Sequence, residues 1–440
     1  MRVTSTREQS YFAGLNELKG VWKQQLKVKL NPMTKSDEKT KYDAYWDICE
    51  KESHTRYPYV YDEPCVITRK RFADFERLQK GLYKAFRYFM PRYQEYEDII
   101  EYSPKSKAIV SHFDLETIRI GFYRPDFVIP EKGEIKICEL GCRYYEAYWG
   151  HGHFEYIMEK RCRCSNANGG DRRIIDKVID GAYRWWTGLD QSLTVLQGRD
   201  REGDIRFYRP YFQEMGTRMR YIYPDTLADQ LDLLQDGPVL NAFSQMELEE
   251  LTSEQLSYLA QADCLNPLST VILLHDKRFL AVLYDDEFRE AALGNEEADF
   301  MAPFLIPTFT RKQDPAIWED AYRNKDGYIL KPQLLGKSEG IVPGPLVTEA
   351  EWKAFFDSEE IETMVLQHFV QQRTFNASID GKRFQDYGTG ILLCLEDELQ
   401  GLGQFRMSSC EVINYISDDR KMVPWITDEH ESYHGNYFLL

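Results

Sequence analysis

The sequence lacks a long apolar run: no stretch of about 18 apolar residues occurs in its 440 residues, and the N-terminus has no apolar leader core. It also lacks a basic excess, because 55 Lys and Arg stand against 72 Asp and Glu, for a net charge of −17. These absences argue against membrane and nucleic-acid partners. Nine cysteines in so long a chain lack the density of a disulfide scaffold. We therefore expect a cytoplasmic protein.

Several catalytic signatures are missing as well. The sequence has no G-x-x-x-x-G-K-[ST] phosphate loop, no G-x-S-x-G elbow and no convincing Cys-His pairing. His151 and His153, followed by Cys162 and Cys164, do not have the spacing of the usual structural zinc sites. The sequence therefore favours chemistry that needs no side-chain nucleophile.

Apolar and aromatic residues are plentiful, at 43% and 14%, so the chain can bury a large core. Its length predicts two to three domains. Residues 1–105 are expected to form a helical, aromatic-rich region. The clearest helix there is indicated by apolar side chains at helical spacing, at Phe72, Phe75, Leu78, Leu82 and Phe86. We interpret this stripe as core packing rather than a binding surface.

A hairpin is predicted further on, among strand-like segments that begin near Thr117. The turn Glu131–Glu134 separates two strands, and Asp126 and Glu139 then stand on neighbouring strands. Carboxylates so placed can share a hard divalent cation such as Mg²⁺, although one solvent-facing acid on each strand is the plainer alternative.

A small α/β unit is predicted next. Its strands are expected at Leu193–Leu196, Arg220–Tyr223 and Val239–Phe243, with a helix over Asp204–Met215. The preceding loop, Cys164–Arg173, is rich in Asn, Gly and Ser. It is interpreted either as an active-site lid or as an ordinary surface connection.

The stretch Tyr328–Val342 carries the strongest phosphate-binding pattern. A short apolar strand delivers Lys331, and a loop with Gly336 and Gly340 follows. Exposed backbone N–H groups in such a loop can form an anion nest, to which a lysine adds charge. The alternative interpretation of this stretch is a strand and a turn with a solvent-exposed lysine that binds no phosphate. Beyond it, a capping box at Thr348 starts a helix, and Met364–Val370 is predicted as a buried strand.

Taken in order, these pieces resemble the ATP-grasp superfamily. LKPQLLGKSEGIV is similar to the nucleotide loop of its circularly permuted branch, which includes glutathionylspermidine synthetase. Arg124-Pro125-Asp126 and Glu139-Leu140-Gly141 resemble that branch's R-x-D and E-x-N elements. Asp276–Leu280 resembles its upstream lysine strand. The resemblance spans roughly residues 118–406.

The resemblance implies an α/β (α+β) protein with a circularly permuted ATP-grasp fold. Residues 106–190 would supply the metal-binding strands and lid loop. Residues 191–265 would form a preATP-grasp-like unit, and residues 266–440 the nucleotide-binding part. Residues 1–105 lie outside the resemblance.

The resemblance also implies site residues, with ATP and Mg²⁺ as cofactors. Asp126 and Glu139 would hold the metal, and Arg124 would steady the transferring phosphoryl group. Nucleotide contacts would come from Lys277, Lys331, Gly336, Lys337, Ser338, Glu339, Gly340, Gln367, His368, Phe369 and Val370. Gly141 stands where the branch has an Asn ligand, so a water or Glu146 would have to replace it, or catalysis is weakened.

The activity implied is an ATP-dependent carboxylate–amine ligase that works through an acyl-phosphate. Its partners would be a small-molecule carboxylate and a small-molecule amine, such as amino acids or polyamines. The sequence leaves homo-oligomer formation open. An ATP-grasp phosphotransferase and a non-catalytic nucleotide-binding protein are the alternatives.

Overall fold

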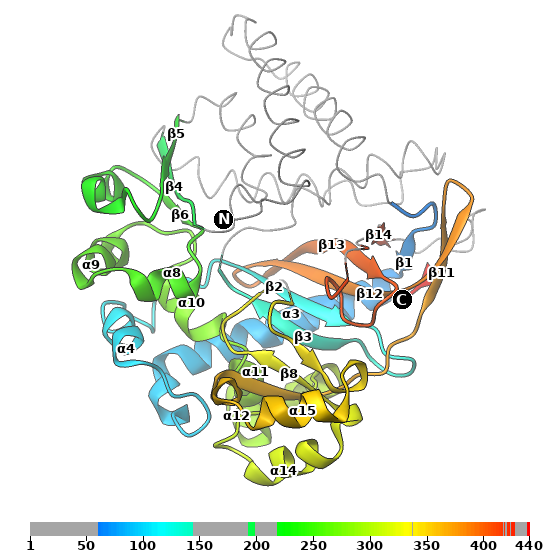
Figure 1. Ribbon diagram of the computed structural model, residues 1–440. Coiled ribbons are helices and arrows are strands. Elements are labelled where there is room, and N and C mark those ends of the chain that lie inside the picture. Colours follow the sequence, from blue (N-terminus) through cyan, green and yellow to red (C-terminus); the bar gives the residue numbers. More distant parts are fainter. Residues whose placement is uncertain are drawn as a thin grey trace, which may run out of the picture. The chain divides into compact units, whose positions relative to one another are not determined.

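The computed structural model describes residues 60–143, 192–198, 218–336, 338–416, 418, 420–422, 424–426 and 438–440 (Figure 1). The chain divides into two units, Met1–Cys49 and Glu50–Leu440, and every described residue lies in the second. The protein combines helices and sheets and is of the α/β class. Several predictions fall outside the described residues: Lys337, Glu146, the residues of the rejected zinc site, the loop Cys164–Arg173 and the helix Asp204–Met215.

The large sheet is antiparallel and has the order β14-β13-β12-β2-β3, with β11 paired to β12. Its strands are β2 (Phe122–Val128), β3 (Lys136–Gly141), β11 (Phe375–Ile379), β12 (Lys382–Leu395), β13 (Glu398–Ser408) and β14 (Arg420–Met422). The predicted hairpin is confirmed, with Gly133 at φ +87° in its turn. β2 begins later than expected, because Gly121 just before it takes φ +82°.

A smaller antiparallel sheet has the order β7-β10-β8-β9. Its strands are β7 (Thr308–Phe309), β8 (Tyr328–Pro332), β9 (Val342–Pro343) and β10 (Met364–His368). Pro332 has no N–H to donate, yet it lies within β8, opposite Met364. The N–H of the next residue, Gln333, donates to Thr363 O at 3.0 Å. Because hydrogen-bonded and non-hydrogen-bonded pairs alternate along antiparallel strands, the pair Pro332–Met364 is a non-hydrogen-bonded one and needs no N–H from the proline.

One face of the smaller sheet is covered by α14 (Pro315–Arg323) and α15 (Glu349–Phe356). Trp318 and Trp352 of these helices pack against Leu330 and Leu366 of the sheet. The predicted capping box at Thr348 is present, because its side chain accepts from the Glu351 N–H. Since alternate strand residues point to opposite faces, Lys331 and Gln367 lie on the other face, away from these helices.

The helix α3 (Arg69–Phe89) packs on the large sheet (Figure 1). Its ring contacts, Phe75 with Phe127 and Phe86 with Tyr123, confirm that the aromatic stripe is core packing. The helices α4, α10, α11, α12 and α13 follow at Pro104–Val110, Leu268–Leu274, Phe279–Tyr284, Asp286–Leu293 and Asn295–Met301. Among the helices that the structure describes, none combines the length and apolar character needed to cross a membrane.

Two further sheets have three parallel-paired strands each. The strands predicted near 193, 220 and 239 are confirmed as β4 (Ser192–Leu196), β5 (Arg218–Ile222) and β6 (Val239–Asn241), in the order β5-β4-β6. The helices α8 (Gln245–Glu250) and α9 (Ser253–Gln261) follow. In the other sheet, β1 (Cys65–Ile67) lies between β15 (Pro424–Ile426) and β16 (Phe438–Leu439).

Candidate functional site

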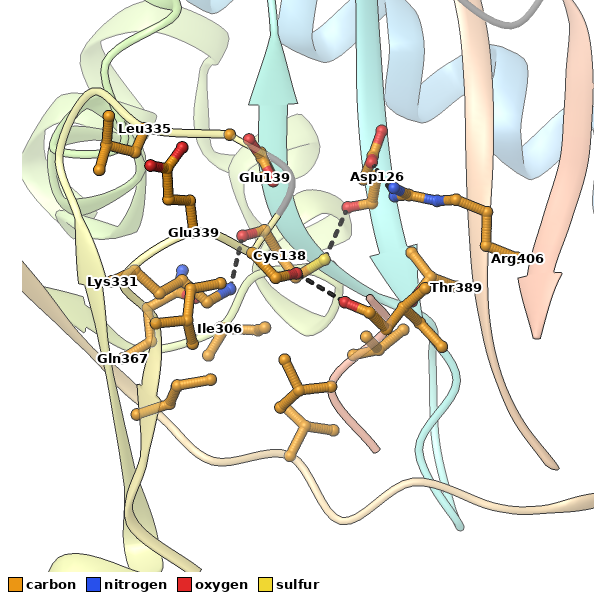
Figure 2. Close-up of a pocket in the computed structure, with 18 of the residues that line it drawn as sticks. Asp126, Cys138, Glu139, Ile306, Lys331, Leu335, Glu339, Gln367, Thr389 and Arg406 are labelled. Carbon is orange, nitrogen blue, oxygen red and sulfur yellow. Dashed lines mark hydrogen bonds and ion pairs between the residues drawn. The ribbon is translucent and has the colours of Figure 1, made fainter. Parts of the chain in front are cut away.

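A cavity of about 450 Å³ lies between the large and the smaller sheet. We call β2, β3 and the neighbouring Arg406 of β13 the hairpin wall. The lysine wall consists of β8, β10 and the loop residues Leu335, Gly336, Ser338 and Glu339. Eleven of the residues singled out in the sequence border the cavity. They are Arg124, Asp126, Glu139, Lys331, Gly336, Ser338, Glu339, Gln367, His368, Phe369 and Val370. Figure 2 shows Asp126 and Arg406 on one side, with Lys331 and Gln367 on the other.

Asp126 is almost fully buried and lies directly opposite Glu139 in the hairpin register. Its carboxylate accepts from Arg124, with Nε–Oδ1 at 2.7 Å and Nη2–Oδ2 at 3.3 Å, and from Arg406. Burial raises the pKa of Asp126, although both guanidinium groups favour the charged form. The carboxylate is therefore held in place by two cations from two different strands.

Glu139 is paired with a different cation. Its Oε1 lies 3.2 Å from Lys277 Nζ. Burial alone would raise the pKa of Glu139, but Lys277, with other nearby groups that include Lys331 and Arg124, favours the carboxylate and brings its pKa down to about 2. Glu139 is thus ionised throughout the physiological pH range.

Lys277 is not on a strand, so the predicted lysine strand at Asp276–Leu280 is wrong. The residue lies in the turn between α10 and α11. All seven residues of α10 are buried, and an apolar run of that kind does not distinguish a buried helix from a buried strand. Lys277 does not border the cavity, yet its Nζ contacts both Glu139 and the carbonyl of Leu335. It therefore links the two walls.

Lys331 projects from β8 into the cavity and is 8% exposed. Its Nζ donates to the carbonyl of Cys138 at 3.0 Å, across from the lysine wall to β3. Burial lowers the pKa of Lys331, and the nearby Lys277 adds to this effect. A lysine that has only one carbonyl as its hydrogen-bond acceptor among the described residues still has two N–H donors for an anion.

The segment Gln367–Val370, to which the resemblance assigns nucleotide contacts, is largely hydrogen-bonded within the protein. The His368 N–H donates to Pro307 O at 3.0 Å, and the Phe369 N–H donates to Gly327 O at 2.8 Å. The N–H of Val370 has no partner within the described part of the chain. The backbone N–H of Val370 is therefore able to donate a hydrogen bond to a nucleotide base bound at this segment.

The glycine loop is tied to a second loop across the cavity. Ser338 takes φ +60°, and its hydroxyl donates to the carbonyl of Ile413 at 2.6 Å. Glu411, Val412 and Ile413 of that second loop also border the cavity. Gly340 has φ +69°, which suits a glycine, but does not border the cavity.

Arg406 and His275 also border the cavity and were not identified from the sequence. Arg406 lies within β13, between the buried Phe405 and Met407, and a cation in such an apolar strand was the available signal. His275 follows α10, and its Nδ1 accepts from the Cys142 N–H at 2.9 Å. Burial, together with Arg143 and Lys277, lowers the pKa of His275 to about 3. No local pattern signals this role, because the partner comes from the hairpin.

The residues present fit Mg²⁺ only in part. Among the described residues, no three His, Cys, Asp or Glu side chains gather closely enough to hold a metal ion. Asp126 and Glu139 are two carboxylates in register, and Mg²⁺ commonly binds one or two carboxylates together with substrate phosphates and water. The pair therefore suits a metal ion that arrives with a nucleotide rather than the free ion.

Lack of space for a side chain does not explain why position 141 is a glycine. It pairs with Arg124 in the hairpin, and a Cβ added there would lie 3.5 Å from Arg124 O as its nearest neighbour, which is ordinary contact. The fold therefore does not require a glycine at position 141 to leave room for a Cβ.

Comparisons with known proteins give a fold-level likeness. Residues 80–273 match the family model described as the AnkG N-terminal domain, which is less than half of the chain. No curated protein matches the sequence. Among solved structures, the chain is similar to a glutathione synthetase-like effector from Globodera pallida in its apo form. That likeness has 12% identity and a TM-score of 0.52, and covers 84% of this chain and 90% of the other.

Proposed function

We propose that the chain is an ATP-dependent carboxylate–amine ligase with a permuted ATP-grasp arrangement. The observation that carries this proposal is the convergence, around one cavity, of Asp126 and Glu139 from one wall with Lys331 and the glycine loop from the other. These groups come from distant parts of the chain. The glutathione synthetase-like structural neighbour supports the same class at the level of fold.

In this proposal the phosphates of ATP lie beside Lys331 and the loop Leu335–Gly340, and the base lies beside Val370. Asp126 and Glu139 would hold Mg²⁺, which would supply charge neutralisation for the phosphates. Arg124 and Arg406 would turn toward the transferring phosphoryl group when Asp126 engages the metal. The protein's contribution is positioning and electrostatic stabilisation.

The reaction would have two steps. A substrate carboxylate oxygen attacks the γ-phosphorus of ATP, the bond to the β-phosphate oxygen breaks, and ADP leaves. The amine nitrogen of the second substrate then attacks the acyl carbon, phosphate leaves, and the nitrogen loses a proton. The products are an amide, ADP and phosphate.

The test is ADP release from purified protein with panels of acids and amines, with the product mass measured. The ligase requires both an acid and an amine. ADP formed with an acid or alcohol alone would instead indicate a phosphotransferase. Lys331→Ala is the site control, and a wild-type protein that Mg·ATP does not stabilise thermally would remove the nucleotide site altogether.

A non-catalytic nucleotide-binding protein is the second candidate, and two observations favour it. Both carboxylates are already occupied by cations, and Gly141 supplies no third ligand. ATP-dependent stabilisation without any ADP release under all substrate pairs would support this alternative.

A further inference from the structure

His275 has a fixed hydrogen-bonding state. The Cys142 N–H donates to its Nδ1 at 2.9 Å. A ring nitrogen that accepts a hydrogen bond carries no proton, so the ring is neutral and its proton is on Nε2. His275 therefore offers the cavity a donor, and not an acceptor or a positive charge.

The Cys142 peptide, which orients His275, is itself hydrogen-bonded to the buried side chain of Asn266. Asn266 is 1% exposed, and its Nδ2 donates to Cys142 O at 3.0 Å and to Phe122 O at 2.7 Å. Its Oδ1 accepts from the Phe122 N–H at 3.1 Å. A Cβ at Gly121 would come within 2.8 Å of that Oδ1, so the glycine makes room for the amide. The tautomer of His275 is thus set by buried, fully bonded neighbours.

The surroundings of His275 are mostly cationic, although the carboxylate of Glu139, which is paired with Lys277, also acts on the ring. Arg124 and Arg143 border the same cavity, and Lys277 is two residues away in sequence. The Nε2 of His275 makes no hydrogen bond to any residue in the described ranges. An N–H donor among cations suits an anionic oxygen. Because Nε2 carries the proton, the ring cannot serve as the metal ligand that Gly141 fails to supply.

We propose that His275 binds an anionic oxygen of a cavity ligand through Nε2–H, as a neutral donor with a fixed tautomer. Phosphate and carboxylate oxygens share this chemistry. The inference depends on the proposed function in one respect only, namely whether the oxygen bound during turnover belongs to a phosphate or to a carboxylate. His275 would thus be a ligand-binding residue of the site that stays neutral when the ligand binds.

Two substitutions separate this role from a structural one. His275→Asn keeps an acceptor near the position of Nδ1 for the Cys142 N–H but loses the distal donor. His275→Gln keeps a distal N–H donor but not the acceptor at the Nδ1 position. We expect the Asn variant to bind ATP about tenfold or more weakly than wild type, and the Gln variant to lie closer to wild type. The reverse order would mean that His275 only holds Cys142, and would overturn the proposal.

A direct readout is the ¹⁵N NMR spectrum of the histidine rings in the full chain, with His275 assigned by its loss in His275→Asn. We expect the Nε2–H tautomer, and movement of that signal on titration with inorganic phosphate, with acetate, or with both. Movement with phosphate alone assigns a phosphate oxygen, and movement with acetate alone assigns a carboxylate. An Nδ1–H tautomer, or no movement with either probe, overturns the inference. If ATP fails to bind wild type but a probe still moves the signal, the proposed function fails and this one stands.

Discussion

The hairpin wall holds its carboxylates in ion pairs, whereas the lysine wall holds Lys331 against a single carbonyl. On the hairpin wall, the Asp126 carboxylate pairs with Arg124 of β2 and Arg406 of β13, and Glu139 pairs with Lys277. On the lysine wall, a buried cation has no carboxylate within hydrogen-bond distance among the described residues. Charge on the first wall is already satisfied within the protein, while charge on the second is available to a ligand.

This difference predicts different consequences of mutation. Removing a partner on the hairpin wall leaves buried charges uncompensated and should affect stability. Removing the cation on the lysine wall deletes a desolvated charge and should affect ligand binding instead. Four measurements can break or sharpen the contrast.

The largest effect is expected for Asp126→Ala. The substitution leaves the guanidinium groups of Arg124 and Arg406 facing each other without their shared acceptor, and should lower the free energy of unfolding by about 3 kcal/mol or more. Urea unfolding measures it. Asp263→Ala is the control, because its ion pair with Arg119 is about 40% exposed on both sides and should matter by less than about 1 kcal/mol. Equal losses in the two variants would contradict the idea that the hairpin wall depends on its ion pairs.

Lys331→Met should have the next largest effect, on binding. A methionine of similar volume removes a charge whose burial is unfavourable, so we expect stability to be kept or slightly improved. ATP affinity should fall by about 10- to 100-fold, the value of a charge-assisted contact. Calorimetric titration with Mg·ATP measures it. Lys325→Met is the control, because that lysine donates to Gly344 O at 2.8 Å and does not border the cavity. Wild-type affinity in Lys331→Met would remove the lysine wall from the nucleotide site.

A pH effect is expected at His275, beside the hairpin wall. Its pKa is about 3 in the folded protein against an ordinary 6.5, so below pH 6.5 the unfolded chain takes up a proton that the folded chain refuses. Stability should therefore fall as the pH drops from 6.5 to 5.5, by about 1 kcal/mol. Thermal unfolding of wild type and His275→Asn across this window measures it. Parallel pH profiles would show that His275 is not the group responsible.

The smallest effect is expected for Gly141→Asn. A Cβ at position 141 would make only ordinary contacts, and in the proposed metal site an amide oxygen there would add a third ligand beside Glu139. The Mg²⁺ concentration needed for half-maximal thermal stabilisation by ATP should fall a few-fold, about 1 kcal/mol or less. Gly133→Asn, in the hairpin turn, is the control. An unchanged or higher Mg²⁺ requirement would mean that the hairpin does not hold the metal.

The hairpin, β8, β10 and the capping box at Thr348 could be predicted from the sequence, because alternation, turn residues and caps are local signals. The sequence predicts Asp126 and Glu139 on neighbouring strands, but their direct facing depends on a register shift between Asp126 and Phe127 that no local signal indicates. The contacts that complete the site are not local. Arg406 reaches Asp126 from 280 residues away, and His275 reaches Cys142 from 133. Lys277 was misplaced on a strand because a fully buried apolar run has no periodicity to read.

The position of β1 has a consequence for folding kinetics. This strand pairs in parallel with β15 on one side and β16 on the other, so both of its partners are made long after it during synthesis. Parallel pairings over such separations raise contact order and slow folding. Until residues 424–439 leave the ribosome, β1 has two open edges that can pair with another chain. We therefore expect chains truncated before β15 to aggregate through β1, even though the cavity residues themselves are all present.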